Sequence, residues 1–300
     1  MAWKEFNIRV MKNRIYQYCI GVCLGLCVAC HSGISWDEDE VGQAREVTFR
    51  ISQADNLLAR ATATSFEIGD SIGIYAVKRD VPGKAKLPGV SGNQAHNAKW
   101  IKTKEGWIPV SLKDKIVFPQ DGSKLDFYAY YPYSRNAENP GKVLMSVNPD
   151  QRAEKGQKGS DWMAAFNTEG VNEGEVNLVF KHLMASVVVE VRASEMLAPN
   201  EELQIQMTNI LLGNRFDLGM NVFAPVEETA GTIDMKRQEE ATEMNSFTYK
   251  ALLPAQTLKA GTPVFRCLQG GKIYIYHGEE IVLERGNCTR FIFTLKSGGE

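Results

Sequence analysis

The stretch Val176-Asn-Leu-Val-Phe-Lys-His-Leu-Met-Ala-Ser-Val-Val-Val-Glu-Val191 decides the fold class. Its apolar residues recur with a period of two, which is the spacing of a β-strand. This spacing places Val187, Val189 and Val191 on one face. We expect these three side chains to point into a hydrophobic core, where the chain crosses into a second β-sheet layer.

Shorter segments repeat this alternation along most of the chain after residue 46. Val47 to Ser52 alternates apolar and polar residues, as do Ser71 to Val77 and Leu125 to Tyr133. Turn signals such as Gly69-Asp70 separate them, and long helical periodicity is nearly absent. Many short strands with turns between them predict an all-β protein with sandwich architecture.

A change in composition divides the strand-rich part in two. Residues 152–175 are rich in Gly, Lys, Asn and Glu, which is typical of a connecting loop. We therefore expect an N-terminal β-sandwich domain over residues 61–175 and a C-terminal one over residues 176–300. The chain of 300 residues is long enough for two domains of ordinary size.

The first 30 residues have the layout of a lipoprotein signal peptide. Four basic residues precede the apolar segment Ile15 to Ala29, which ends at Cys30. This segment is too short to span about 30 Å of hydrocarbon stably, so we favour a signal over a transmembrane anchor. Cys30 is the expected lipid acceptor, although Cys27 stands where such signals usually carry leucine. A start at Met11 in place of Met1 would give a more ordinary signal length.

Residues 31–60 combine a polar start with a first strand. Ser32 to Glu40 is acidic, and a charge run this short is normally a solvated tether. The alternative is a surface-export tag. The strand Val47 to Ser52 follows, and the segment ends at Arg60.

Four segments resemble the fimbrillin family of Bacteroidetes in their order and spacing. They are Phe66-Glu-Ile-Gly-Asp-Ser-Ile-Gly-Ile-Tyr-Ala76, Leu125-Asp-Phe-Tyr-Ala-Tyr-Tyr-Pro-Tyr133, Ser160-Asp-Trp-Met-Ala-Ala165 and Leu178-Val-Phe-Lys-His-Leu-Met-Ala-Ser-Val-Val-Val-Glu-Val191. The resemblance implies two transthyretin-like Greek-key β-sandwiches in tandem, which form a subunit of a fimbria. It also implies lipoprotein export, trimming after an arginine by a trypsin-like protease, and assembly with other subunits by strand exchange.

The residues of the first and last strands permit such an exchange. Removal of the first strand would leave an apolar groove and a row of unpaired main-chain groups, which is a template for another strand. The last strand is the candidate donor, and each buried side chain contributes about 1.5 to 3 kcal/mol. The alternative is that both segments are ordinary edge strands of a monomer. The residues that face the groove or would enter it are Val47, Phe49, Ile51, Phe291, Phe293 and Leu295.

Arg60 is the expected cleavage site, which makes Ala61 the new first residue. Arg60 lies among polar and small residues, where proteolytic nicking concentrates, and Arg60-Ala-Thr matches the family resemblance. Arg50 lies within the first strand, where its backbone is paired. Cleavage after Arg45 would leave that strand attached.

Two of the six cysteines lie in the part that we expect to fold. Cys267 and Cys288 could form a disulfide in an oxidising compartment, if their Cα atoms approach within about 7 Å. Cys19, Cys23 and Cys27 have a metal-like spacing, but they lie within the apolar signal segment.

The sequence indicates no catalytic, metal or cofactor site. A net charge of −2 without a basic stripe argues against nucleic-acid binding. His182 lies in an apolar strand, where packing is favoured over metal binding. Asp121, Asp126 and Asp161 invite a glycosidase-type carboxylate pair, but sequence alone supplies no geometry for one.

Aromatic residues leave a second function open. They could stack on sugars or bind a host protein, although packing in a β-sandwich explains them equally well. The alternative to a fimbrial subunit is therefore an outer-membrane lipoprotein that binds glycans or host proteins without polymerising. Both functions place the protein at the cell surface, held to the outer membrane by its lipid. The aromatic residues in question are Trp100, Trp107, Tyr128, Tyr130, Tyr131 and Tyr133.

Overall fold

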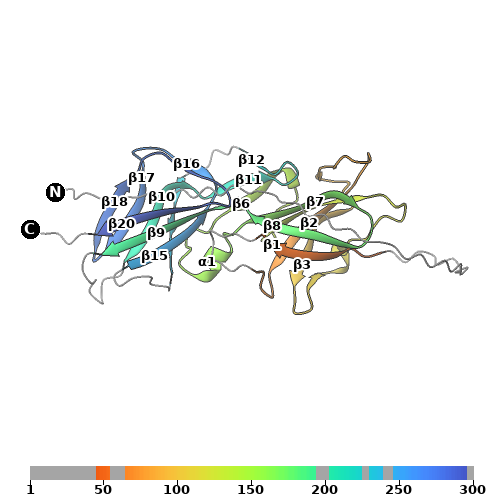
Figure 1. The fold of residues 1–300 in the computed structure, drawn as a ribbon, viewed down its shortest axis with the longest axis horizontal. Helices are drawn as coiled ribbons and strands as arrows, with labels where there is room; N and C mark the ends of the chain where they lie inside the picture. Colours follow the sequence, from red (N-terminus) through yellow and green to blue (C-terminus); the bar gives the residue numbers. More distant parts are fainter. Residues whose placement is uncertain (1–44, 55–64, 194–202, 225–229, 239–245, 296–300) are drawn as a thin grey trace, which may run out of the picture.

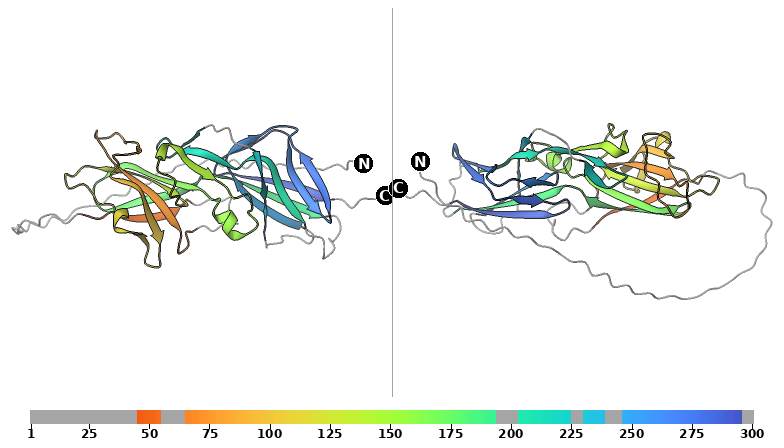
Figure 2. Two further views of the ribbon diagram at one scale, coloured as in Figure 1. Left: turned by 180° about the vertical axis from the view of Figure 1, so that it is seen from behind. Right: turned by 90° about the horizontal axis from the view of Figure 1, so that it is seen from above.

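The computed structural model describes residues 45–54, 65–193, 203–224, 230–238 and 246–295. Strands dominate these residues, which confirms the all-β prediction. One short helix, α1 (Glu154–Lys158), and two 3₁₀ turns at Leu112–Asp114 and Pro140–Lys142 accompany them. The molecule is elongated, with the early strands at one end and the late strands at the other (Figures 1 and 2). Cys30, Arg60 and Ala61 lie outside the described residues.

The early part of the chain forms one sheet of seven strands in the order β1-β8-β7-β5-β2-β3-β4. One face of this sheet is a hydrophobic core built from alternating side chains, among them Ile72, Ile74 and Phe127. β1 and β4 are its edge strands. The strands are β1 (Thr48–Gln53), β2 (Ser71–Lys78), β3 (Ala95–Lys102), β4 (Trp107–Pro109), β5 (Leu125–Tyr131), β7 (Met163–Val171) and β8 (Glu175–His182).

The remaining strands form four smaller sheets. Their orders are β13-β10-β17-β18, β14-β15-β9-β20, β12-β11-β6 and β16-β19. The strands are β6 (Val143–Ser146), β9 (Ala185–Ala193), β10 (Gln204–Leu211), β11 (Gly213–Asp217), β12 (Val222–Ala224), β13 (Ala230–Asp234), β14 (Lys236–Arg237), β15 (Ser246–Leu253), β16 (Gln256–Leu258), β17 (Pro263–Gln269), β18 (Lys272–His277), β19 (Ile281–Leu283) and β20 (Cys288–Leu295).

The two four-stranded sheets share one hydrophobic core. Val187, Val189 and Val191 of β9 are fully buried in it, as the period-two spacing predicts. Phe265 of β17 meets Phe291 of β20 across this core, with ring centroids 4.8 Å apart. Burial of large apolar side chains from both sheets is what holds the pair together.

The chain leaves the seven-stranded sheet later than the composition suggests. β8 starts at Glu175 and pairs with β1 and β7, so it belongs to the first sheet. The crossing to the next sheet occurs at Leu183 and Met184, between β8 and β9, and the expected domain start at residue 176 falls inside the first sheet. The division into two domains stays a prediction, because β6 pairs with β11 across the expected boundary.

A buried glutamine fixes the loop before α1 to β15. Gln151 precedes α1 and is fully buried. Its side-chain Nε2 donates a hydrogen bond of 2.7 Å to the Leu252 carbonyl oxygen, and its Oε1 accepts one of 2.9 Å from the Leu252 amide. This pairs both main-chain groups of Leu252, which would otherwise be costly to bury. The loop before α1 is thereby fixed to β15.

Candidate strand-exchange site

β1 is an edge strand that pairs only with β8. The pairing is parallel and runs from Thr48 opposite Glu175 to Gln53 opposite Phe180. At its two ends the Val47 amide donates to the Ile116 carbonyl and the Ala54 amide donates to the Phe180 carbonyl, both at 2.8 Å. The Phe118 amide also donates to the Arg45 carbonyl at 2.9 Å, beside a bridge between Glu46 and Val117. One ladder and three flanking hydrogen bonds therefore connect the main chain of β1 and its ends to the rest of the domain.

The first three inward side chains, from Val47 just before β1 to Ile51, are apolar, and they pack in a core that contains aromatic residues. Val47 and Phe49 are buried and Ile51 is partly buried, as the alternation predicts. The Phe49 ring makes edge contacts with Trp100 and Phe127, with centroids 4.8 and 5.5 Å away. We call this place the β1 groove; β8 forms its side, and Trp100 and Phe127 form its floor.

The outward side chains of β1 add little to its attachment. Thr48, Arg50 and Ser52 are exposed. Arg50 forms an ion pair of 2.9 Å with Glu175, but both side chains are in contact with water. Exposed pairs of this kind contribute 0 to about 1 kcal/mol. β1 is held mainly by three inward apolar side chains, its ladder, and the main-chain hydrogen bonds at its ends.

β20 is the corresponding edge strand at the other end of the molecule. It pairs only with β9, again in parallel, from Cys288 opposite Ser186 to Leu295 opposite Ala193. Phe291, Phe293 and Leu295 all point into the core and are buried. The candidate donor strand is thus part of the core that the two four-stranded sheets share.

β1 and β20 lie end to end on the same side of the continuous path from β8 to β9. Alternate residues of an extended chain direct their main-chain groups to the same side. The carbonyl of Phe180 accepts from Ala54 beyond β1, whereas the carbonyl of Met184 accepts from Gly286 just before β20. Leu183, between them, donates to the opposite side, to the Trp162 carbonyl. The β1 groove therefore ends where the turn before β20 begins.

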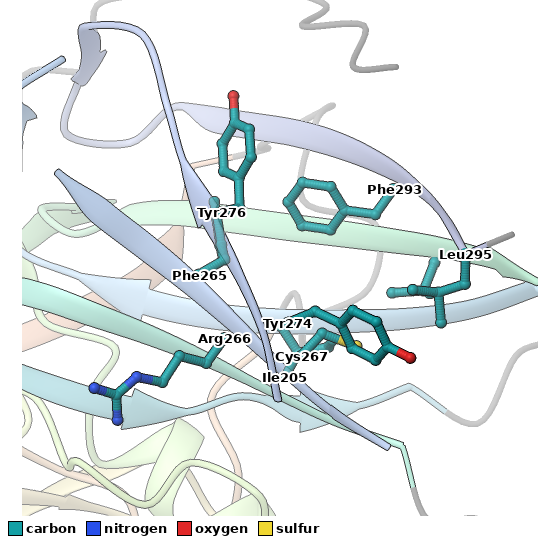
Figure 3. A pocket seen from close by; sticks show the side chains of 9 residues that line it. Ile205, Phe265, Arg266, Cys267, Tyr274, Tyr276, Phe293 and Leu295 are labelled. Atoms are coloured by element: carbon teal, nitrogen blue, oxygen red, sulfur yellow. The ribbon is translucent and has the colours of Figure 1, made fainter. Parts of the chain in front are cut away.

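An apolar hollow opens beside β20. It lies between the two edge strands β18 and β20 and is shown in Figure 3. Its volume is about 310 Å³, including the part open to solvent. Its lining is mainly apolar and aromatic, and the guanidinium of Arg266 points away from it in Figure 3. The main lining residues are Phe265, Cys267, Tyr274, Tyr276, Phe293 and Leu295. We interpret it as a gap in the open side of the sandwich.

The two cysteines of the folded part do not form a disulfide. Both are free, with Cys267 buried and Cys288 partly buried. Cys267 lines the hollow near Leu295, at the end of β20, whereas Cys288 begins that strand. Seven residues of strand span about 23 Å. This is well beyond the distance that a disulfide bridges.

Most of the aromatic residues considered for ligand binding are structural. Trp100, Tyr128, Tyr130 and Tyr131 are buried. Their polar atoms bond within the protein; the Trp100 Nε1 donates to the Asp114 carbonyl and the Tyr131 hydroxyl donates to Asp70. These four rings are not available to stack on a sugar.

The carboxylates considered as a catalytic pair are engaged with separate partners. Asp126 is fully buried and lies 2.8 Å from Arg79, while Asp161 lies 2.7 Å from the His182 Nδ1. A hydrogen bond from Lys78 lowers the pKa of Asp121 to about 2.

Within the described ranges no group of three or more His, Cys, Asp or Glu residues could hold a metal ion. No described helix is long and apolar enough to cross a membrane.

Comparison with known proteins agrees with this arrangement. Residues 59–300 match the model of the family described as fimbrillin-like. The "Putative fimbrium subunit Fim1C" of Bacteroides uniformis is 25% identical over 244 residues, which cover 80% of this chain and 72% of that protein.

Two crystal structures described as a "putative cell adhesion protein" share the fold. The one from Bacteroides ovatus has a TM-score of 0.63 at 17% identity and covers 86% of this chain and 94% of its own. The one from Bacteroides uniformis has a TM-score of 0.60 at 20% identity and covers 85% and 94%. The family match spans most of the sequence, and this chain belongs to the fimbrillin-like family.

Proposed function

We propose that this protein is a subunit of a cell-surface fimbria that assembles by exchange of β1. It is exported as a lipoprotein anchored at Cys30 to the outer membrane, and a trypsin-like protease cleaves it after Arg60. The observation that carries the proposal is the attachment of β1, an edge strand with three inward apolar side chains and a single ladder.

The position of β1 in the chain supports its release. Gln53 ends the strand, and the expected cleavage bond between Arg60 and Ala61 follows it. The family match begins at residue 59, beyond β1. A chain cut after Arg60 keeps the rest of the seven-stranded sheet, and β8 becomes its edge.

Before cleavage β1 holds the precursor as a monomer. A tethered strand acts at an effective concentration in the mM range, which a free donor does not match. After cleavage β1 can leave, and the strand of a neighbouring subunit restores the ladder and the burial. β20 is the strand that this chain would donate, and it would first have to separate from β9.

Substitution of Arg60 tests the proposal. Arg60→Ala should leave an uncleaved precursor that stays monomeric under an arginine-specific protease, while the wild type loses residues up to 60 and forms heat-resistant ladders on gels. Arg45→Ala is the matched control and should behave like the wild type, because cleavage there leaves β1 attached. Polymers of Arg60→Ala would show that release of β1 is unnecessary. A cleaved wild type that stays monomeric would favour the non-polymerising lipoprotein.

A further inference from the structure

A second hollow lies where the β1 groove ends, and we call it the acidic hollow. Its volume is about 450 Å³, including the part open to solvent. Gln53, the last residue of β1, contributes to its wall. The other lining residues that matter are Glu67, Asp70, Gln157, Lys158 and Asp161.

Negative charge predominates in the acidic hollow. Four carboxylates line it, and two lysines offset them, Lys158 in the lining and Lys236 as the ion-pair partner of Glu154. Asp161 also contacts the His182 Nδ1 at 2.7 Å. The carboxylates are Glu67, Asp70, Glu154 and Asp161. Lys158 is already engaged, with its Nζ 2.5 Å from Glu67 and 2.9 Å from Asp70. The hollow therefore favours a cationic occupant.

Gln53 fits the acidic hollow poorly. Its Oε1 and the Nε2 of Gln157 are both buried, and neither has a hydrogen-bond partner among the residues that the structure describes. Gln157 itself is only 3% exposed. A buried polar atom without a partner destabilises the arrangement that contains it. β1 thus fills the apolar positions of its groove well and the following inward position badly.

We propose that the acidic hollow selects the strand that replaces β1. The occupant is a strand from another kind of subunit, with three alternating apolar residues followed, at the next inward position, by Lys or Arg. The ammonium or guanidinium group lies among the carboxylates, and a half-turn of the Gln157 amide lets its oxygen accept a hydrogen bond from it. This inference rests on the proposed strand exchange and names the partner of that same groove.

A second copy of this chain does not supply such a residue. If Phe291, Phe293 and Leu295 take the three apolar positions in the direction of β1, Ser297 reaches the position of Gln53. In the opposite direction Thr289 reaches it. Neither side chain is basic, so the acidic hollow favours a mixed polymer over a polymer of identical subunits.

Displacement of β1 by synthetic strands tests the inference. The full chain is cleaved after Arg60, and peptides that share the Val47 to Ser52 sequence and differ only at the next residue compete with the bound β1 fragment. We expect the peptide with Lys to bind about tenfold tighter than the one with Gln, and the one with Glu to bind weakest. A peptide of residues 288–300 should bind no tighter than the Gln peptide.

Variants of the acidic hollow provide the second arm. Asp161→Asn and Glu67→Gln, each tested alone, should reduce the preference for Lys over Gln. Glu169 is an exposed carboxylate outside the hollow, so Glu169→Gln should leave the preference for the Lys peptide unchanged. Equal binding of the Lys and Glu peptides, or tighter binding of the 288–300 peptide, would overturn the inference while leaving strand exchange intact. If no peptide displaces β1 from the cleaved chain, both the inference and strand exchange fail.

Discussion

β1 and β20 have the same position in their sheets but different roles in their cores. Both are edge strands, both run parallel to their single neighbour, and both lie along the path from β8 to β9. β20 is longer, and Phe291 and Phe293 contact the Phe265 ring across the sandwich. β1 ends in a glutamine whose side-chain oxygen lacks a partner among the described residues.

The two strands differ in how much of their core each one supplies. Without β1 the seven-stranded sheet keeps six strands and most of its core. Without β20 the core of the C-terminal sandwich opens beside the apolar hollow, because Phe293 and Leu295 form part of the wall. Under the proposed strand exchange, release of β1 would therefore disturb less of its core than release of β20 would disturb of its own.

Truncation of one phenylalanine in each strand should give the largest contrast. Phe291→Ala should lower the free energy of unfolding by about 3 to 5 kcal/mol, since it leaves a cavity among packed rings. Phe49→Ala should lower the free energy of unfolding by a smaller amount, because an edge strand that is held on one side can shift to fill the space. Chemical denaturation of the full chain measures both values. An equal or greater loss of unfolding free energy for Phe49→Ala would contradict the proposed difference between the two strands.

Native-state hydrogen exchange should show the contrast without any substitution. The Ala54 amide bonds to the Phe180 carbonyl across the β1 junction, and the Ser186 amide bonds to the Asn287 carbonyl beside β20. Local opening of a weakly attached strand needs less free energy than global unfolding. We expect the Ala54 amide to exchange at least about tenfold faster than the Ser186 amide. Comparable rates would mean that β1 is held as firmly as β20.

Thiol labelling should give the smallest effect and concerns β20 alone. Burial raises the pKa of Cys267 to about 12, and the thiolate is the reactive form. At pH 8 an alkylating reagent should therefore modify Cys288 and spare Cys267, with the rate at Cys267 rising toward alkaline pH. Phe293→Ala should accelerate labelling of Cys267, and Phe49→Ala, the matched control, should not. Acceleration by Phe49→Ala would show that the two strands are coupled.

Local alternation made several of these features predictable from the sequence. The inward faces of β1 and β20 and the buried valines of β9 follow from the period of two. The sheet to which each strand belongs does not follow from it. β8 and β9 read as one apolar run, and only the change of partners at Leu183 and Met184 separates them. The pairing of β6 with β11 cannot be predicted from local alternation either, because it joins segments that are distant in the sequence.

The acidic hollow could be predicted only in part. Gln53 continues the alternation of Val47, Phe49 and Ile51 by one position, so its inward direction is a signal in the sequence. The carboxylates around it come from separate parts of the chain, and the loop carrying Asp161 is placed by contacts with His182. Charge complementarity at the end of a groove is a property of the assembled sheets, which no local pattern encodes.

The end-to-end arrangement of β1 and β20 has a mechanical consequence. β8 and β9 run roughly along the long axis of the molecule (Figure 1), and each edge strand runs parallel to one of them. A pull along that axis on a strand in the β1 groove loads its hydrogen bonds in shear, so that they must yield together rather than one after another. The subunit is built to resist stretching along its length more strongly than peeling from its side.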